Sequence, residues 1–206
     1  MTLDLLTVLL AFAFVSAMTP GPNNLMLVAS GANFGFRRTV PHMLGITIGF
    51  PAMIFLVGLG VMRLFDLWPP SYVILKVLSV AYLLYLAWKI ANAAPPQEAK
   101  AEGRPLTFLQ SAAFQWVNPK AWSMALSAIT LYATSRDLEA ILWVVGAFFV
   151  VSFVSTTSWT VLGQQVQRFL KDPGTLRKFN IFMAVLLVAT LIPVLWPGAE
   201  QGSLAR

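Results

Sequence analysis

An apolar run near the N-terminus is interrupted by the stretch Met18-Thr19-Pro20-Gly21-Pro22-Asn23-Asn24-Leu25. Without the interruption, the run would extend from Leu3 to Val28. The two prolines remove backbone donors and clash with the preceding helical turn, while Gly21 adds backbone freedom. Freed backbone groups find no partner in lipid, so the interruption must face protein or a watery cavity. A broken apolar helix with polar groups at the break is typical of the binding site of a transporter.

The composition is that of an integral membrane protein. The chain has 206 residues, of which 58% are hydrophobic and 11% charged, and its mean hydropathy is +0.74. A soluble domain carries roughly a quarter of charged residues, and runs of about 20 apolar residues can cross a bilayer. The net charge of +6 comes from basic residues scattered through short loops. They indicate topology signals and not a nucleic-acid partner.

Residue counts exclude several kinds of site. The sequence has no cysteine and one histidine, His42, so disulfides, thiolate catalysis and Cys-based or multi-His metal sites are excluded. We predict neither a metal nor a cofactor. The segment Leu5–Ala17 has the length of a signal-peptide core, but Asp4 precedes it and no Lys or Arg does. We therefore expect the first helix to be retained.

Six apolar segments predict an all-α integral membrane protein with six transmembrane helices. The segments are Leu3–Val28, Val40–Met62, Tyr72–Ile90, Leu106–Ala133, Ala140–Leu162 and Phe179–Trp196. We expect one transmembrane domain over residues 1–206, with a three-helix half at 1–91, a cytoplasmic linker at 92–105 and a second three-helix half at 106–206.

Lys and Arg counts predict the orientation. The loops after the first, third and fifth segments carry nine of these residues, including Arg37 and Arg38, and the opposite side carries four. Because cytoplasmic loops are enriched in Lys and Arg, we expect the odd-numbered loops to be cytoplasmic and both termini to lie outside. His42 is expected at the same cytoplasmic interface, where a topology role is favoured over a gate.

A second interruption lies inside the fourth segment, at Gln115-Trp116-Val117-Asn118-Pro119-Lys120-Ala121-Trp122. Pro22 and Pro119 stand 97 residues apart (119 minus 22). The same offset carries the second segment onto the fifth and the third roughly onto the sixth. Three segments per half mean that the halves insert with opposite polarity. The prediction is two inverted repeats, with helices 1 and 4 broken and meeting near the midplane.

Lys120 is the one charge well inside an apolar segment, since all eight acidic residues lie at segment ends or in loops. A central Lys costs about 3 kcal/mol or more, so it must line a cavity or be paired. Two interpretations stay open. Lys120 either attracts an anionic group of a ligand, or it binds backbone carbonyls freed by Pro119 and stabilises the break.

The polar groups at the breaks suit an amino acid. Asparagine side chains donate and accept hydrogen bonds, and helix N-termini add partial positive charge for a carboxylate. The alternative is that the amides satisfy only the broken backbone. The predicted substrate-binding residues are Pro20, Gly21, Pro22, Asn23, Asn24, Asn118, Pro119 and Lys120.

The lack of an acid inside the apolar segments favours a cargo with a neutral side chain. Proton coupling would then depend on Asp4, and the choice between protons and sodium stays open. Small residues allow close helix packing in lipid. The candidates are Gly45 and Gly49 on the second segment and Ser152, Ser155 and Ser158 on the fifth. Packing within one chain is favoured over a homodimer face.

These stretches resemble the LysE/RhtB family of bacterial amino acid exporters, in the family's order and over almost the full length. The matching motifs are Thr19-Pro20-Gly21-Pro22-Asn23-Asn24, Gly35-Phe36-Arg37, Gly45 with Gly49, Ala81-Tyr82-Leu83-Leu84-Tyr85-Leu86-Ala87-Trp88-Lys89 and Asn118-Pro119-Lys120-Ala121. Ala87 departs from the family, which often has Gly there. The resemblance implies export of small amino acids or their derivatives across the bacterial inner membrane. The termini, which the Lys and Arg counts place outside, would then be periplasmic. The sequence from Phe114 to Trp122 resembles that of exporters of neutral and sulfur-containing amino acids more than that of the lysine branch.

The favoured function is a secondary transporter that exports small neutral amino acids by alternating access. A channel or a membrane assembly factor is the alternative, and a channel would carry a polar stripe along several helices. An intramembrane enzyme would need a nucleophile with a base, a metal cluster or paired acids. Of these catalytic arrangements, only a Ser–Lys pair with Lys120 is compatible with the sequence, and no motif supports it. We therefore expect that the protein is not an enzyme.

Overall fold

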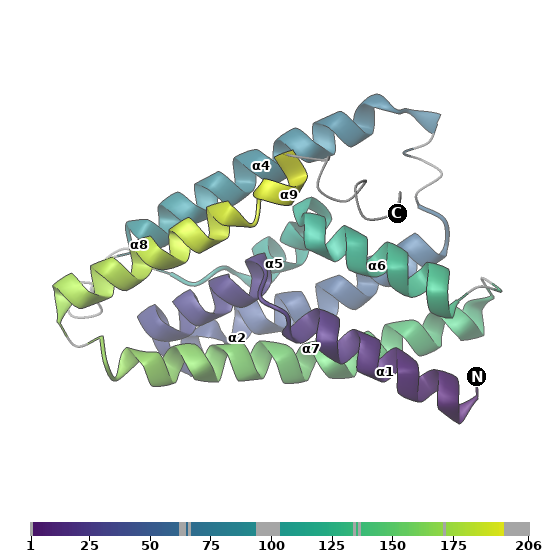
Figure 1. Cartoon of the computed structure of the whole chain (residues 1–206), viewed down its shortest axis with the longest axis horizontal. Helices are drawn as coiled ribbons and strands as arrows, with labels where there is room; N and C mark the ends of the chain where they lie inside the picture. The colour runs from purple at the N-terminus through teal and green to yellow at the C-terminus, as the bar shows by residue number, and fades with distance from the viewer. Residues whose placement is uncertain are drawn as a thin grey trace, which may run out of the picture.

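The computed structural model describes residues 2–61, 65, 67–93, 104–133, 135, 137–170 and 172–195. Within these ranges the regular structure is entirely helical (Figure 1). The helices are α1 (Leu3–Met18), α2 (Pro22–Gly58), α4 (Pro70–Ala91), α5 (Phe108–Phe114), the 3₁₀ turn η1 (Gln115–Val117), α6 (Pro119–Tyr132), α7 (Leu138–Gln167), α8 (Pro173–Ala189) and α9 (Ile192–Leu195).

Four helical stretches are long and apolar enough to cross a membrane: Pro22–Gly58, Pro70–Ala91, Leu138–Gln167 and Pro173–Leu195. The helix α1 is apolar but shorter. Large apolar side chains are exposed along the outward faces of these helices, for example Val77 on α4, Phe153 on α7 and Val185 on α8. Such surfaces suit lipid, so the prediction of an all-helical membrane protein is confirmed.

The first two predicted segments are joined by a reversal inside α2. Gly35 has φ 76° and ψ 171°, a left-handed region open mainly to glycine. The hydroxyls of Ser30 and Thr39 are 2.9 Å apart, whereas nine residues of straight helix would separate them by roughly 13 Å. The arms before and after Gly35 therefore fold back on each other. The prediction of a loop between the two segments is wrong, because Arg37 and Arg38 are helical. The single residue Gly35 makes the whole turn.

The helices run between two ends of the molecule, as Figure 1 shows. One end, here called the Gly35 end, holds the α2 reversal, the end of α4, the end of α7 and the start of α8. The opposite end holds the start of α1, the start of α4 and the α6–α7 connection. The connections after the first, third and fifth segments, which we expect on the same side of the membrane, thus lie at the same end of the molecule. Most of the expected linker, 94–103, lies outside the described residues.

The α2 helix packs backbone to backbone against its neighbours at glycines. A Cβ on Gly163 of α7 would lie 2.9 Å from Cα of Val28, and one on Gly49 would lie 2.7 Å from Cα of Ala112 on α5. A Cβ on Gly45 would lie 2.6 Å from Cβ of Ser111. The expectation that Gly45 and Gly49 serve packing within the chain is confirmed. Ser158 does not share that role, because it is exposed on α7.

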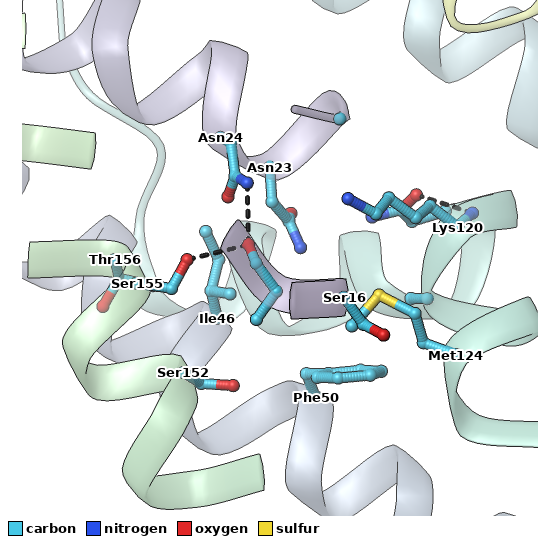
Figure 2. A pocket seen from close by; sticks show the side chains of 14 residues that line it. Ser16, Asn23, Asn24, Ile46, Phe50, Lys120, Met124, Ser152, Ser155 and Thr156 are labelled. Atoms are coloured by element: carbon cyan, nitrogen blue, oxygen red, sulfur yellow. Dashed lines mark hydrogen bonds between the residues drawn. The ribbon is translucent and has the colours of Figure 1, made fainter. Parts of the chain in front are cut away.

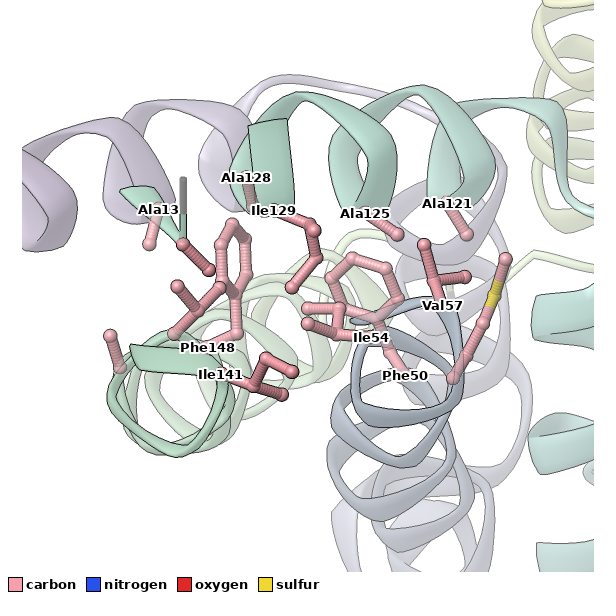
Figure 3. Packing of buried hydrophobic residues seen from close by; sticks show 14 of the residues in the cluster. Ala13, Phe50, Ile54, Val57, Ala121, Ala125, Ala128, Ile129, Ile141 and Phe148 are labelled. Carbon is pink, nitrogen blue, oxygen red and sulfur yellow. The ribbon is translucent and has the colours of Figure 1, made fainter. Parts of the chain in front are cut away.

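The main apolar core lies between α1, α2, α6 and α7 (Figure 3). Ala121, Ala125 and Ala128 recur at the helical spacing on one face of α6, and they allow this helix to approach the larger side chains of α2 and α7. Phe50 of α2 and Phe148 of α7 pack edge to face, with ring centroids 5.5 Å apart. This core supports the breaks in the neighbouring helices.

The sixth segment begins earlier than expected, at Pro173 instead of Phe179. Asp172 caps the helix, because its carboxylate accepts a hydrogen bond of 2.8 Å from the backbone N–H of Thr175. That bond, together with one from the Thr175 hydroxyl, lowers the pKa of Asp172. Proline then occupies the first helical turn, where no backbone donor is needed. The expected ends at Met62 and Trp196 lie outside the described residues.

Candidate functional site

The two interrupted helices meet at their breaks. The α1 helix ends at Met18 and α2 begins at Pro22, while η1 ends at Val117 and α6 begins at Pro119. Both prolines occupy the first position of the new helix, where the missing N–H costs nothing. Each break therefore exposes a helix N-terminus, with its partial positive charge, toward the same region.

Lys120 connects the two breaks. Its Nζ donates a hydrogen bond to the backbone carbonyl of Thr19. The side chain passes directly over Gly21, where an added Cβ would lie 2.6 Å from Cδ of Lys120. The backbone at Gly21 is extended, a conformation that any residue can adopt. Glycine is therefore needed here only to let the Lys120 side chain approach closely. The Lys120 ammonium therefore replaces a backbone donor that the first break lacks.

The carbonyl partner of Lys120 differs from the one expected. The sequence suggested carbonyls freed by Pro119 itself, but the partner belongs to the other break. At the second break, Trp122 Nε1 donates to the carbonyl of Trp116 at 2.8 Å. Asn118 caps α6, since its side-chain oxygen accepts from the Lys120 backbone N–H at 3.1 Å. The second break is satisfied locally, which leaves the Lys120 side chain for the first.

A pair of amides forms a further connection. Asn23 Nδ2 donates to Gln115 Oε1 at 2.8 Å, and Gln115 Nε2 donates to Asn23 Oδ1 at 3.1 Å. Gln115 is fully buried and also donates to the carbonyl of Ser111 at 2.9 Å. The pair joins the start of α2 to η1, so it couples the two breaks through neutral groups.

The last turn of α1 is completed by side chains from two other helices. Asn24 Nδ2 donates to the carbonyls of Ala17 and Thr19, at 2.8 and 2.9 Å. Ser155 Oγ of α7 donates to the same Ala17 carbonyl at 2.9 Å, and Figure 2 shows both bonds meeting at one oxygen. Asn24 and Asn118 thus satisfy the broken backbone in this conformation.

A small pocket of about 40 Å³ lies where these groups meet. This volume holds only a few water molecules, so the pocket is too small for an amino acid in this conformation. Its lining combines the polar groups of the breaks with Phe50 and Met124 (Figure 2). The lining residues are Ser16, Ala17, Gly21, Asn23, Asn24, Ile46, Phe50, Asn118, Lys120, Ala121, Met124, Ser152, Ser155 and Thr156. It is called the central pocket below.

Among the residues that the structure describes, none with a carboxylate lines the central pocket. The acidic side chains that the structure describes are all exposed at helix N-termini: Asp4, Asp137, Glu139 and Asp172. Lys120 is therefore the one charged group among the described residues that line the pocket.

Five of the eight predicted site residues line the central pocket: Gly21, Asn23, Asn24, Asn118 and Lys120. Pro20, Pro22 and Pro119 shape the breaks without lining it. Sequence reasoning missed Gln115 and Ser155 as site residues. Gln115 stands three residues before Asn118 in the second interruption, so its place in that motif was the available signal. Ser155 was interpreted as a packing residue only.

Paired helix breaks that close around a polar pocket define a multi-pass membrane protein of the transporter class. The chain belongs to the LysE type translocator family, which it matches over residues 14–192. The resemblance drawn from the sequence is thereby confirmed. Because this is a family of translocators, the expectation that the chain is not an enzyme holds.

Curated relatives match the chain over nearly its full length. The cysteine/O-acetylserine efflux proteins of Escherichia coli strain K12, E. coli O9:H4 strain HS and Shigella sonnei strain Ss046 are each 30% identical over 199 residues. Each alignment covers 95% of this chain and 100% of the relative. No solved structure matches the chain significantly.

Proposed function

We propose that this protein exports small neutral amino acids of the cysteine or O-acetylserine kind across the bacterial inner membrane. The observation that carries the proposal is the similarity to cysteine/O-acetylserine efflux proteins along their full length. The central pocket supports it, since it offers one cation and several amides to a zwitterion. Once the pocket widens, Phe50 and Met124 would give it an apolar wall suited to a small neutral side chain.

Lys120 is proposed to bind the cargo carboxylate. In this conformation its ammonium donates a hydrogen bond to the Thr19 carbonyl. A carboxylate is a stronger acceptor than a neutral carbonyl, so entering cargo would draw the ammonium away from Thr19. The hydrogen bond from Lys120 to Thr19, which joins the two breaks, would then be broken only when cargo is bound. The amides of Asn23, Asn24 and Asn118 would bind the remaining polar groups.

The proposed motion is alternating access between two inverted halves, residues 1–91 and 106–206. In Figure 1, α1 and the first arm of α2 run toward the Gly35 end, whereas α5 and α6 run away from it. Opposite directions of two corresponding broken helices support an inverted repeat. With the Gly35 end cytoplasmic, both termini are periplasmic, as the Lys and Arg distribution favours. Six membrane crossings follow if α1 with the first arm of α2, and α5 with α6, each cross once.

Export can be tested in cells preloaded with peptides that release cysteine or serine inside. Efflux is compared between the wild type, Lys120→Ala and Asn23→Ala at matched membrane abundance, with Lys76→Ala as the control. Lys76 is exposed on α4 and outside the central pocket. We expect wild-type and Lys76→Ala cells to export and the other two to lose most of the activity. Wild-type efflux no faster than from empty cells would contradict the proposal.

A channel is the alternative, and counterflow separates it from a transporter. Proteoliposomes loaded with unlabelled O-acetylserine should accumulate labelled O-acetylserine against its gradient if the protein is a transporter. A channel would only equilibrate the label. Saturation of the rate with cargo concentration is expected for the same reason.

A further inference from the structure

A second cavity, of about 330 Å³, opens at the Gly35 end between the two arms of α2, the end of α4 and residues 104–106. Its volume falls in the range of roughly 300–1,000 Å³ that is common for small-molecule sites. The central pocket, at about 40 Å³, does not. In this conformation the larger cavity therefore has room for an amino acid and the central pocket has none.

The two cavities follow one another along both arms of α2. Asn23, Met26, Ser30 and Asn33 share one stripe of the first arm, because they are spaced three or four residues apart. Asn23 lines the central pocket, and the other three line the larger cavity. On the second arm, Ile46 lines the central pocket and His42, one turn away, lines the larger cavity.

The lining of the larger cavity suits an anion next to neutral polar groups. Lys89, half-buried at the end of α4, and Arg104 both line it, and no carboxylate does among the described residues. Asn33 adds an amide that is paired with Asn180, at 2.7 and 3.0 Å. Two cations beside a neutral polar wall match the carboxylate end of a small zwitterion.

His42 gives an independent sign of a ligand. Its side chain is 1% exposed, and neither Nδ1 nor Nε2 has a hydrogen-bond partner. A buried polar group without a partner is costly and uncommon in folded proteins. An imidazole in the wall of a cavity large enough for a ligand can gain that partner from the ligand or its water.

We propose that this larger cavity is a loading site, which binds the carboxylate of the exported amino acid before the cargo reaches the central pocket. Lys89 and Arg104 bind the carboxylate, and His42 provides a polar contact deeper in the cavity. The Asn23–Gln115 pair then stands at the boundary to the central pocket. The proposal rests on the proposed export function and adds a second, separate binding site to it.

The absence of cysteine from the sequence makes a direct test available. Ala93→Cys places one thiol in the lining of the cavity, and Ser135→Cys places one at the opposite end, where residue 135 is exposed. The full-length protein in detergent is labelled with a maleimide, with and without O-acetyl-L-serine. We expect the cargo to slow labelling of Ala93→Cys at least threefold and to leave Ser135→Cys unchanged.

Two further probes identify the recognised group. O-acetyl-L-serine methyl ester lacks the carboxylate and should give little protection. Inorganic phosphate tests a general anion site, such as one for a lipid headgroup, and should also protect little at the same concentration. Equal protection by the ester, or stronger protection by phosphate, would overturn the proposal.

Variants separate the loading site from the central pocket. In the Ala93→Cys background, Lys89→Gln with Arg104→Gln should raise the cargo concentration for half-maximal protection by about tenfold, as expected for lost charged hydrogen bonds. Lys76→Gln on the same helix is the matched control. Lys120→Ala should keep the protection, because it acts in the other pocket. Protection that is lost with Lys120→Ala and kept in the double variant would show that only the central pocket binds cargo.

The cell efflux experiment keeps the two proposals distinguishable. If the wild type exports amino acids but no cargo protects Ala93→Cys, the loading site is wrong and the export function stands. If the wild type exports nothing and O-acetyl-L-serine gives no protection, both are wrong.

Discussion

Two kinds of close contact at glycine differ sharply in this molecule. At Gly163 the α2 and α7 backbones touch directly, with the Cβ position 2.9 Å from Cα of Val28. At Gly21 the neighbour is instead the long side chain of Lys120, 2.6 Å away at Cδ. A backbone of a packed helix cannot yield, whereas a lysine can take another rotamer. The α2–α7 contact is thus a rigid scaffold, and the break junction is a contact that can be released.

The largest effect is expected from a methyl group at the rigid contact. Gly163→Ala must push α7 away from α2, since the three nearest atoms all belong to the backbone of Val28. Overpacking of this kind costs about 1–3 kcal/mol or more. We expect a clear fall in the midpoint of thermal unfolding in detergent and a lower yield of folded protein.

The control for that variant lies on the same helix. Gly146 is exposed, and a Cβ there meets nothing within 4 Å. Gly146→Ala should be neutral or slightly stabilising, because alanine favours helix by up to about 1 kcal/mol over glycine. Equal melting temperatures for the two variants would show that the α2–α7 contact is not rigid.

The same methyl group at the releasable contact should affect transport more than stability. In Gly21→Ala, the Lys120 side chain can move aside, so the unfolding free energy should change by less than about 1 kcal/mol. Its ammonium would leave the Thr19 carbonyl, and we expect efflux to fall roughly tenfold. A variant that exports at the wild-type rate would show that the position of Lys120 over Gly21 is unimportant.

The Asn23–Gln115 pair gives an intermediate effect that a double-mutant cycle can isolate. Asn23→Leu and Gln115→Leu each leave one amide without its partner, and the double variant removes both. Interhelical hydrogen bonds in membranes contribute about 0.6–2 kcal/mol. We expect a coupling energy of that size from the unfolding of the four proteins in detergent. Simple additivity would mean that the pair does not hold the breaks together.

Much of this arrangement could be predicted from the sequence, because it depends on local chemistry. The breaks at Pro20–Pro22 and at Pro119 follow from the missing backbone donors. Lys120 stood out because a charge inside an apolar segment needs a partner. The packing of Gly45 and Gly49 followed from their four-residue spacing.

The remainder depends on contacts between distant residues. The Asn23–Gln115 pair spans 92 positions, and the bond from Lys120 to Thr19 spans 101. A sequence pattern within one segment cannot indicate hydrogen bonds between residues so far apart in the chain. The reversal at Gly35 was missed for a different reason, since a single glycine with positive φ leaves no run of loop residues in the sequence. The large cavity is formed by three segments and has no motif of its own.

The smallest effect is expected at the cap of α6. The side-chain oxygen of Asn118 accepts one hydrogen bond, from the Lys120 backbone N–H. Asn118→Ala should cost about 1 kcal/mol of stability, the usual value of a lost N-cap. Asn118→Asp keeps the accepting oxygen and should restore most of the melting temperature. If both variants melt alike, the cap does not stabilise the break.

The role of Lys120 is tested most directly by counterflow in proteoliposomes. Wild type, Lys120→Met and the control Lys76→Met are reconstituted at equal amounts, and exchange of labelled O-acetylserine is measured. Methionine keeps the length and apolar stem of lysine and removes the ammonium. The account predicts exchange near the wild-type rate for Lys76→Met and at least a tenfold loss for Lys120→Met. Exchange by Lys120→Met within twofold of the wild type would contradict it, because Lys120 would then only tie the two breaks together.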